Sequence, residues 1–182
     1  PTFAGASKIV LAGGSAGGYG ALLNWDRTQA AFGAIRVDMI DDSGQMLPHP
    51  YFDAALQETM MTAWGLEANL PADCASCLDD PSAIYDFLAG KHAGSRAALL
   101  TYYYDDVIAS YLQITVGEFL DGLSQLAPVF NAHANLEAFG VDATGHVLMA
   151  PGWNQLSAGG TPLRQWLTQM VEDDPAWTTS LD

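Results

Sequence analysis

The sequence predicts an α/β fold with a mostly parallel sheet and helices on both faces. Short runs rich in apolar and β-branched residues recur along the chain, and stretches with helical periodicity separate them. Short connections between these segments predict right-handed parallel β-α-β units. The chain has 182 residues, so residues 1–182 are predicted to form a single domain.

The first predicted strand leads directly into a glycine-rich turn. Residues 9–11 read Ile-Val-Leu, residues 13–17 read Gly-Gly-Ser-Ala-Gly, and a helix is predicted from Ala16 onward. This is a G-x-S-x-G pattern between a strand and a helix, the context in which Ser15 would be a nucleophile on a strained turn. The N–H of Ala16 is the predicted oxyanion donor, because a helix N-terminus favours negative charge. The alternative is a glycine-rich turn that happens to contain a serine.

The remaining elements follow from periodicity and from Gly and Pro breaks. We expect helices over residues 20–31, 51–67, 82–90 and 162–174, and a long helical stretch over 107–126 broken near residue 115. Strands are expected over residues 35–40, 96–104 and, as the last strand, 136–141.

Composition excludes several classes of function. A net charge of -15 argues against nucleic acid and anionic membrane surfaces as partners. No apolar run approaches the roughly 20 residues that span a bilayer. No cofactor or metal site is predicted from the sequence.

Cys74 and Cys77 form a C-x-x-C pair in a loop predicted over residues 70–81. Such a pair can be a redox dithiol, half of a zinc site, or disulfide halves. Disulfides are favoured, because the chain has no second cysteine pair and no aromatic-flanked redox signature. The two cysteines would pair with each other or with cysteines outside this chain. Both arrangements predict an oxidising setting, secreted or periplasmic.

Candidate catalytic residues follow Ser15 in the order Ser…Asp…His, which is the order of α/β-hydrolases. Asp105 ends the strand predicted over residues 96–104, and His146 follows the predicted last strand. His146 would take the proton of Ser15 Oγ, and Asp105 would orient the imidazole. Asp106 and Asp42 are alternative acids, although Asp106 is also well placed as a helix N-cap. The other histidines, at positions 49, 92 and 133, are expected to be solvated loop residues.

Several segments resemble the pectin acetylesterase and Notum-like family of α/β-hydrolase serine esterases. Residues 10–18 resemble its nucleophile segment, with Gly14 where the family usually has cysteine. The Asp-Ser-Gly at residues 42–44 resembles its D-[SA]-G step, and Leu-Pro at 70–71 followed by Cys74 resembles its L-P-x-x-C element. Residues 104–108 are similar to the stretch that bears the acid, with Ile108 where a glutamine is common. The Gly-His at residues 145–146 lies where the family has its histidine.

This resemblance implies a secreted serine carboxylesterase that removes acyl groups, often acetyl, from carbohydrate hydroxyls or other small esters, without a metal. Two rival functions remain: a lipase or polyester depolymerase, and a non-catalytic binding protein on the same fold. In such a sheet the nucleophile strand lies near the middle, with several strands before it. We therefore expect N-terminal strands and a glycine-rich oxyanion loop in an upstream segment of the same protein, missing from this chain.

Overall fold

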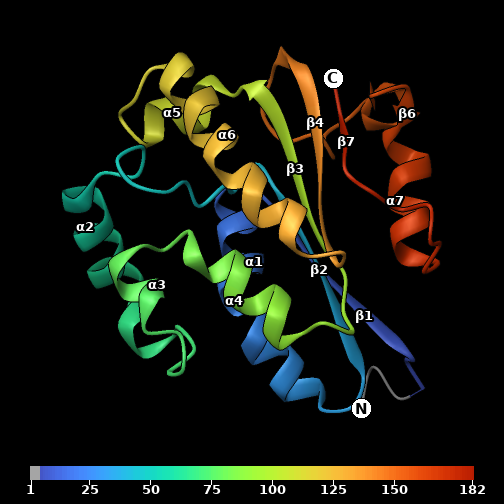
Figure 1. The fold of residues 1–182 in the computed structure, drawn as a ribbon, viewed down its shortest axis with the longest axis horizontal. Helices are drawn as coiled ribbons and strands as arrows, with labels where there is room; N and C mark the ends of the chain where they lie inside the picture. The colour runs from blue at the N-terminus through green and yellow to red at the C-terminus, as the bar shows by residue number, and fades with distance from the viewer. Residues whose placement is uncertain (1–4) are drawn as a thin grey trace.

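The structure is a computed structural model that describes residues 5–182. Its centre is a five-stranded parallel sheet in the order β1-β2-β3-β4-β7, which confirms the predicted α/β class (Figure 1). The strands of the sheet are β1 (Lys8–Gly14), β2 (Arg36–Asp42), β3 (Ala97–Tyr104), β4 (Leu136–Thr144) and β7 (Ser180–Leu181). The helices are α1 (Ala16–Phe32), α2 (Ala54–Trp64), α3 (Ser76–Asp79), α4 (Ala83–Lys91), α5 (Asp106–Tyr111), α6 (Val116–Ala132) and α7 (Leu163–Val171), with short 3₁₀ turns η1 (Leu66–Ala68) and η2 (Trp153–Gln155).

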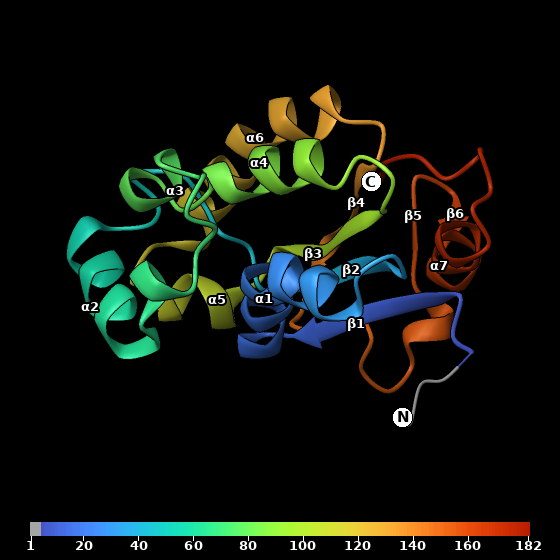
Figure 2. The same ribbon diagram turned by 90° about the horizontal axis from the view of Figure 1, so that it is seen from below.

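Helices cover both faces of the sheet. On one face α1, α4 and α6 build a core around Trp25, Tyr85 and Phe119. On the other face α7 packs Trp166 against Phe139 of β4, with ring centroids 5.5 Å apart. Figure 1 shows α6 and α7 on opposite sides of β3, β4 and β7, and Figure 2 shows α4 and α6 together above the strands. The central strands are therefore buried from both sides, as parallel strands require.

The strand that leads to Ser15 lies at an edge of this sheet. β1 pairs with β2 from Lys8↔Arg36 to Gly14↔Asp42, and no other described strand pairs with it. Val10 on β1 is 38% exposed, whereas every residue of β2 after Arg36 is buried. The outer edge of β1 thus presents unpaired backbone groups and apolar side chains.

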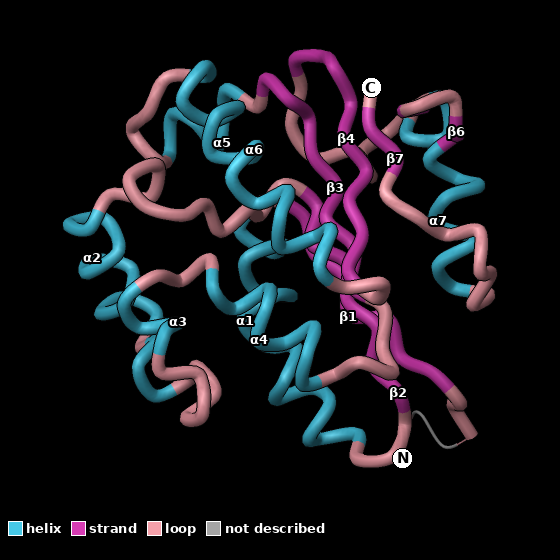
Figure 3. Tube along the Cα trace, viewed as in Figure 1, coloured by secondary structure: helices cyan, strands magenta, loops and turns pink. Residues whose placement is uncertain are grey.

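The segment between β2 and β3 departs from the predicted long helix over residues 51–67. Asp53 caps α2 by accepting hydrogen bonds from the N–H groups of Ala55 and Leu56. Gly65, with a left-handed φ of 58°, ends α2 after Trp64. Figure 3 shows α2 and α3 separated by loops in this excursion. The disulfide between Cys74 and Cys77 lies here, which settles the pairing in favour of the two cysteines with each other.

Residues 136–141 form part of β4, as predicted, but the prediction that this is the last strand was wrong. Three two-residue strands follow it: β5 (Ser157–Ala158) pairs with β6 (Thr161–Pro162), and β7 extends the main sheet beyond β4. Strands this short leave no alternating pattern in the sequence, because alternation needs about four residues to be recognised.

Candidate active site

The candidate residues gather at the carboxyl edge of the sheet. β1 ends at Gly14, β2 at Asp42 and β3 at Tyr104, and the loop after β4 carries His146. Ligand sites of open parallel sheets form outside this edge.

Ser15 occupies a strained turn between β1 and α1. Its φ of 57° and ψ of -124° are unusual for a residue with a side chain. A Cβ at Gly13 would lie 2.0 Å from the carbonyl oxygen of Gly17, so this turn can close only around glycine. The Ser15 N–H donates to the carbonyl of Asp42 over 2.8 Å, which extends the β1–β2 ladder up to the turn. The local geometry is therefore that of a nucleophile elbow.

The first turn of α1 leaves the N–H groups of Ala16 and Gly17 outside the helical ladder, and that of Ala16 directly follows Ser15. The Ser15 carbonyl accepts from the N–H groups of Gly18 and Tyr19. The N–H of Ala16 has no hydrogen-bond partner among residues 5–182. It is thus available to a ligand at the positive end of a 17-residue helix.

His146 and Asp105 are in direct contact. His146 Nδ1 lies 2.9 Å from Asp105 Oδ2 and 3.1 Å from Oδ1. The Asp105 carboxylate is fully buried, and its Oδ1 also accepts from the N–H of Ile108 over 3.0 Å. Because a carboxylate accepts, the proton of a neutral imidazole belongs on Nδ1, which leaves a lone pair on Nε2.

The loop that follows His146 is fixed to the end of β2. The Asp42 carboxylate accepts from the N–H groups of Leu148 and Met149, each over 2.8 Å. Ser43 Oγ accepts from the N–H of Val147 over 3.0 Å. Three successive N–H groups after His146 are therefore bound by two adjacent residues at the carboxyl end of β2.

This loop brings His146 to the Ser15 turn. A Cβ at Gly14 would lie 3.0 Å from Val147 Cγ1, so glycine at position 14 gives the loop room. Gly14 precedes Ser15, and Val147 follows His146. No hydrogen bond joins Ser15 Oγ to His146 within the described part of the chain.

Burial perturbs the two carboxyl groups at the end of β2. It raises the pKa of Asp41 to about 7, although a 2.8 Å hydrogen bond from the Tyr85 hydroxyl opposes the shift. Burial also raises the pKa of Asp42, against the hydrogen bonds from Met149 and Leu148 and the nearby charge of His146. Asp42 thus interacts with His146 in two ways: it binds the backbone of the histidine loop, and the charge of His146 acts on its carboxyl group.

Among the three candidate acids, Asp105 contacts the histidine ring. Asp42 binds the backbone of the histidine loop instead, and Asp106 is exposed at the start of α5. The interpretation of Asp106 as an N-cap was wrong, because Asp105 is the cap and accepts from the Ile108 N–H. The role of Asp42 could be recognised only once the loop after β4 was placed at the end of β2.

The other three histidines contact partners away from this edge. His49 Nε2 lies 3.2 Å from the carbonyl oxygen of Asp79, and His133 Nε2 lies 2.7 Å from Asp86 Oδ1. His92 was wrongly expected to be solvated. Its side chain is 11% exposed, its ring centroid lies 5.2 Å from that of Trp25, and its Nε2 pairs with Asp26 over 2.9 Å.

A cavity of about 140 Å³ opens directly beside Ser15. Tyr19 lies on α1 and Tyr111 on α5, the helices that follow Ser15 and Asp105, whereas Trp64 comes from α2, which the sequence did not connect with the site. Its lining residues are Ser15, Ala16, Tyr19, Trp64, Val107, Ile108 and Tyr111.

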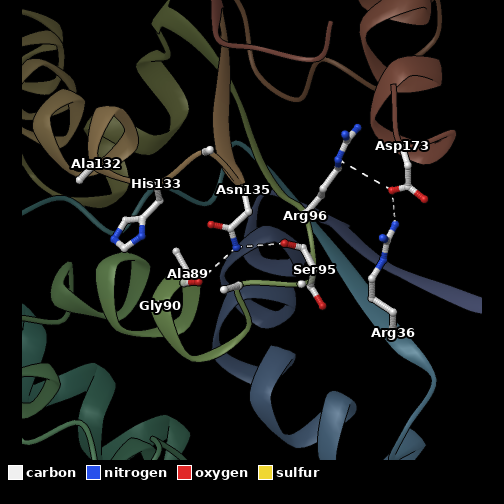
Figure 4. Close-up of a pocket in the computed structure, with 12 residues that line it drawn as sticks. Arg36, Ala89, Gly90, Ser95, Arg96, Ala132, His133, Asn135 and Asp173 are labelled. Carbon is white, nitrogen blue, oxygen red and sulfur yellow. Dashed lines mark hydrogen bonds and ion pairs between the residues drawn. The ribbon is translucent and has the colours of Figure 1, made fainter. Parts of the chain in front are cut away.

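A further cavity of about 540 Å³ lies at the amino ends of β2 and β3 (Figure 4). Figure 4 shows Arg36 and Arg96 pointing toward Asp173 from two sides. Lys8 joins this cluster, with Nζ 2.9 Å from Asp173 Oδ2. Three of the six Lys and Arg residues are therefore engaged in ion pairs at the end of the sheet opposite Ser15. Among the described residues, no group of His, Cys, Asp and Glu is arranged to hold a metal ion.

The family model for pectinacetylesterase matches residues 2–117, well over half of the chain. This chain belongs to the pectinacetylesterase family. The matched part of this family member contains Ser15, Asp42 and Asp105, and His146 lies beyond it. No curated protein matches the chain. None of the helices described is long and apolar enough to cross a membrane.

Proposed function

We propose that this chain is the catalytic region of a serine carboxylesterase that removes O-acyl groups from a carbohydrate or other small ester. Ser15 is the nucleophile, His146 the general base and Asp105 the orienting acid. The observation that carries this proposal is the 2.9 Å contact between His146 Nδ1 and the buried Asp105, at the edge where Ser15 stands on its strained turn.

In the proposed reaction, Ser15 Oγ attacks the ester carbonyl carbon while His146 Nε2 takes the hydroxyl proton. The tetrahedral intermediate expels the alcohol, which leaves with that proton, and an acyl group remains on Ser15. Water then attacks the acyl group on Ser15 while His146 takes its proton, and the carboxylic acid is released as the proton returns to Ser15 Oγ. Asp105 keeps the proton on Nδ1 and stabilises the imidazolium in both halves.

The Ala16 N–H is the proposed oxyanion donor. An oxyanion that lacks one of its donors loses about 3 kcal/mol, or some hundredfold in rate. Since one donor is weaker than two or three, we propose that an upstream segment of the same protein supplies the others and pairs with the exposed edge of β1. Residues 1–182 alone should then hydrolyse nitrophenyl acetate at least a hundredfold more slowly than the complete gene product. Equal rates would contradict this assignment of the missing donors.

The disulfide supports a secreted or periplasmic location, because such bonds persist in oxidising compartments. Fractionation of the source cells, with a cytosolic enzyme as marker, tests this part of the proposal.

A fluorophosphonate probe separates an esterase from a binding protein, because only an activated serine reacts. In the complete gene product we expect one labelled peptide, containing Ser15, and no labelling after Ser15→Ala. Ser124→Ala, at an exposed serine of α6, is the control serine variant, and it should still be labelled. Failure to label Ser15 in a folded protein would favour the non-catalytic alternative. Acetylated sugars compared with long-chain nitrophenyl esters then separate an acetylesterase from a lipase or polyester depolymerase.

A further inference from the structure

The cavity beside Ser15 has an almost entirely apolar wall. Tyr19 and Ile108 form its floor and are each 2% exposed. The Tyr19 hydroxyl donates to the carbonyl of Gln45 over 3.1 Å, so its polar group is already satisfied outside the cavity. The ring of Tyr19 lies 5.9 Å from that of Trp64 and 6.4 Å from that of Tyr111, measured between centroids. Three aromatic rings therefore enclose a space next to the proposed nucleophile.

The cavity opens to solvent on the side of α5. Val107 and Tyr111 are 47% and 44% exposed, and both line the cavity. Ser15 and Ala16 also line it, so an acyl carbon bonded to Ser15 Oγ, with its oxygen at the Ala16 N–H, would lie at one end of this space. The chain of the acyl group is the part of an ester that would enter.

The size of the cavity defines the acyl group. A closed apolar cavity of about 150 Å³ holds a benzene ring, which has six carbon atoms. The cavity here measures about 140 Å³, so an acetyl group would leave most of it empty. We propose that this cavity is an acyl pocket for groups of about four to six carbon atoms, and that Trp64 sets the upper limit. This inference rests on the proposed function.

Trp64 separates this pocket from a second cavity. The second space, of about 220 Å³, shares Ala16, Tyr19 and Trp64 with the first. It continues along α1 toward the amide side chains of Asn24 and Asn69. Removing the indole of Trp64 would join the two spaces and lengthen the acyl pocket.

The test is an acyl-length series in the complete gene product. Nitrophenyl esters from acetyl to decanoyl are compared by kcat/KM. Each buried methylene is worth about fourfold, so butanoyl should exceed acetyl by about fifteenfold. We expect the rate to fall beyond hexanoyl in the wild type. In Trp64→Ala the optimum should move to octanoyl or longer, with at least a tenfold gain for decanoyl.

Two variants control this series. Trp64→Phe keeps an aromatic wall and should keep the wild-type optimum. Trp153→Ala removes a similarly half-buried tryptophan in η2 and should leave the profile unchanged. A Ser15-dependent activity that is highest on acetyl, or a profile that Trp64→Ala does not move, would overturn the acyl-pocket proposal alone.

Labelling gives a second readout that does not need turnover. A hexyl phosphonofluoridate should react with Ser15 faster than its methyl analogue, and Trp64→Ala should extend this preference to the decyl compound. Absence of all Ser15-dependent labelling and turnover would instead overturn the proposed function.

Discussion

Two neighbouring strands of the sheet, β2 and β3, each carry an Asp-Asp dipeptide at the carboxyl end, yet the two dipeptides make different contacts. Asp41 and Asp42 are the last residues of β2, and both are buried. Asp105 and Asp106 follow the last residue of β3, and only Asp105 is buried. The sequence alone makes these pairs look alike.

The difference lies in where each strand ends. β2 continues through its pair, so the two side chains point to opposite faces of the sheet. Asp41 meets Tyr85 on the face covered by α1 and α4, and Asp42 meets the histidine loop. β3 stops at Tyr104, before its pair, and its chain turns into α5 with Asp105 as the N-cap. This turn places the Asp105 carboxylate at the ring of His146.

Loss of His146 should have the largest effect, because one acid of each pair acts through it: Asp105 contacts the ring and Asp42 holds its loop. His146→Ala and Ser15→Ala should each lower kcat by about 10⁴- to 10⁶-fold, and the double variant should be little worse. Steady-state rates on a nitrophenyl ester, with circular dichroism as the folding check, measure this. Full additivity of the two losses would contradict a joint mechanism.

Asp105→Asn should follow, with a loss of about 10⁴-fold in kcat. The Ile108 N–H holds Oδ1, so the new amide nitrogen takes the place of Oδ2 and donates to His146 Nδ1. The imidazole is then forced into the wrong tautomer. Asp106→Asn is the matched control, and its kcat should stay within about twofold because Asp106 is exposed.

Asp42→Asn should cost less, about 10- to 100-fold in kcat/KM. An amide can accept from only one of the two N–H groups of Leu148 and Met149, so the loop shifts while the ring keeps Asp105. Kinetics of this variant beside Asp105→Asn measure the difference. A larger loss for Asp42→Asn would reverse the assignment of the acid.

Asp41→Asn should change the pH dependence of stability rather than activity. The pKa of Asp41 is about 7 in the folded protein and near 3.8 when unfolded, so stability falls as pH rises from about 4 to 7 and levels off above. In the wild type this decrease in the free energy of unfolding should be on the order of a few kcal/mol, and it should be absent in Asp41→Asn. Urea unfolding between pH 4 and 8 tests it. Identical slopes in the two proteins would show that Asp41 does not titrate this way.

Substrate charge should give the smallest effect. Carboxylates crowd the edge that holds Ser15, and Arg36, Arg96 and Lys8 are paired at the other end of the sheet. Acetylated pectin, a polyanion, should therefore be hydrolysed several-fold more slowly than neutral acetylated sugars at low salt. The gap should narrow above about 0.1 M salt, where the Debye length is about 10 Å. A rate on pectin that falls with added salt would indicate an attractive basic groove.

The sequence predicted the local parts of this site and missed the parts made by long-range contacts. The strand, turn and helix around Ser15 are encoded within one stretch, so they could be predicted together with the parallel sheet. His146 and Asp105 followed from their order along the chain. The role of Asp42 depends on a loop more than a hundred residues away, and Trp64 reaches Ser15 from the excursion between β2 and β3. Neither contact leaves a periodic pattern.

The most direct test of the distinction between Asp105 and Asp42 is the tautomer of His146, observed by ¹⁵N NMR of histidine-labelled protein above the imidazole pKa. His146→Gln identifies the signals. We predict an Nδ1-protonated ring in the wild type and in Asp42→Asn, and an Nε2-protonated ring in Asp105→Asn. An Nδ1-protonated ring that survives Asp105→Asn and is lost in Asp42→Asn would contradict it.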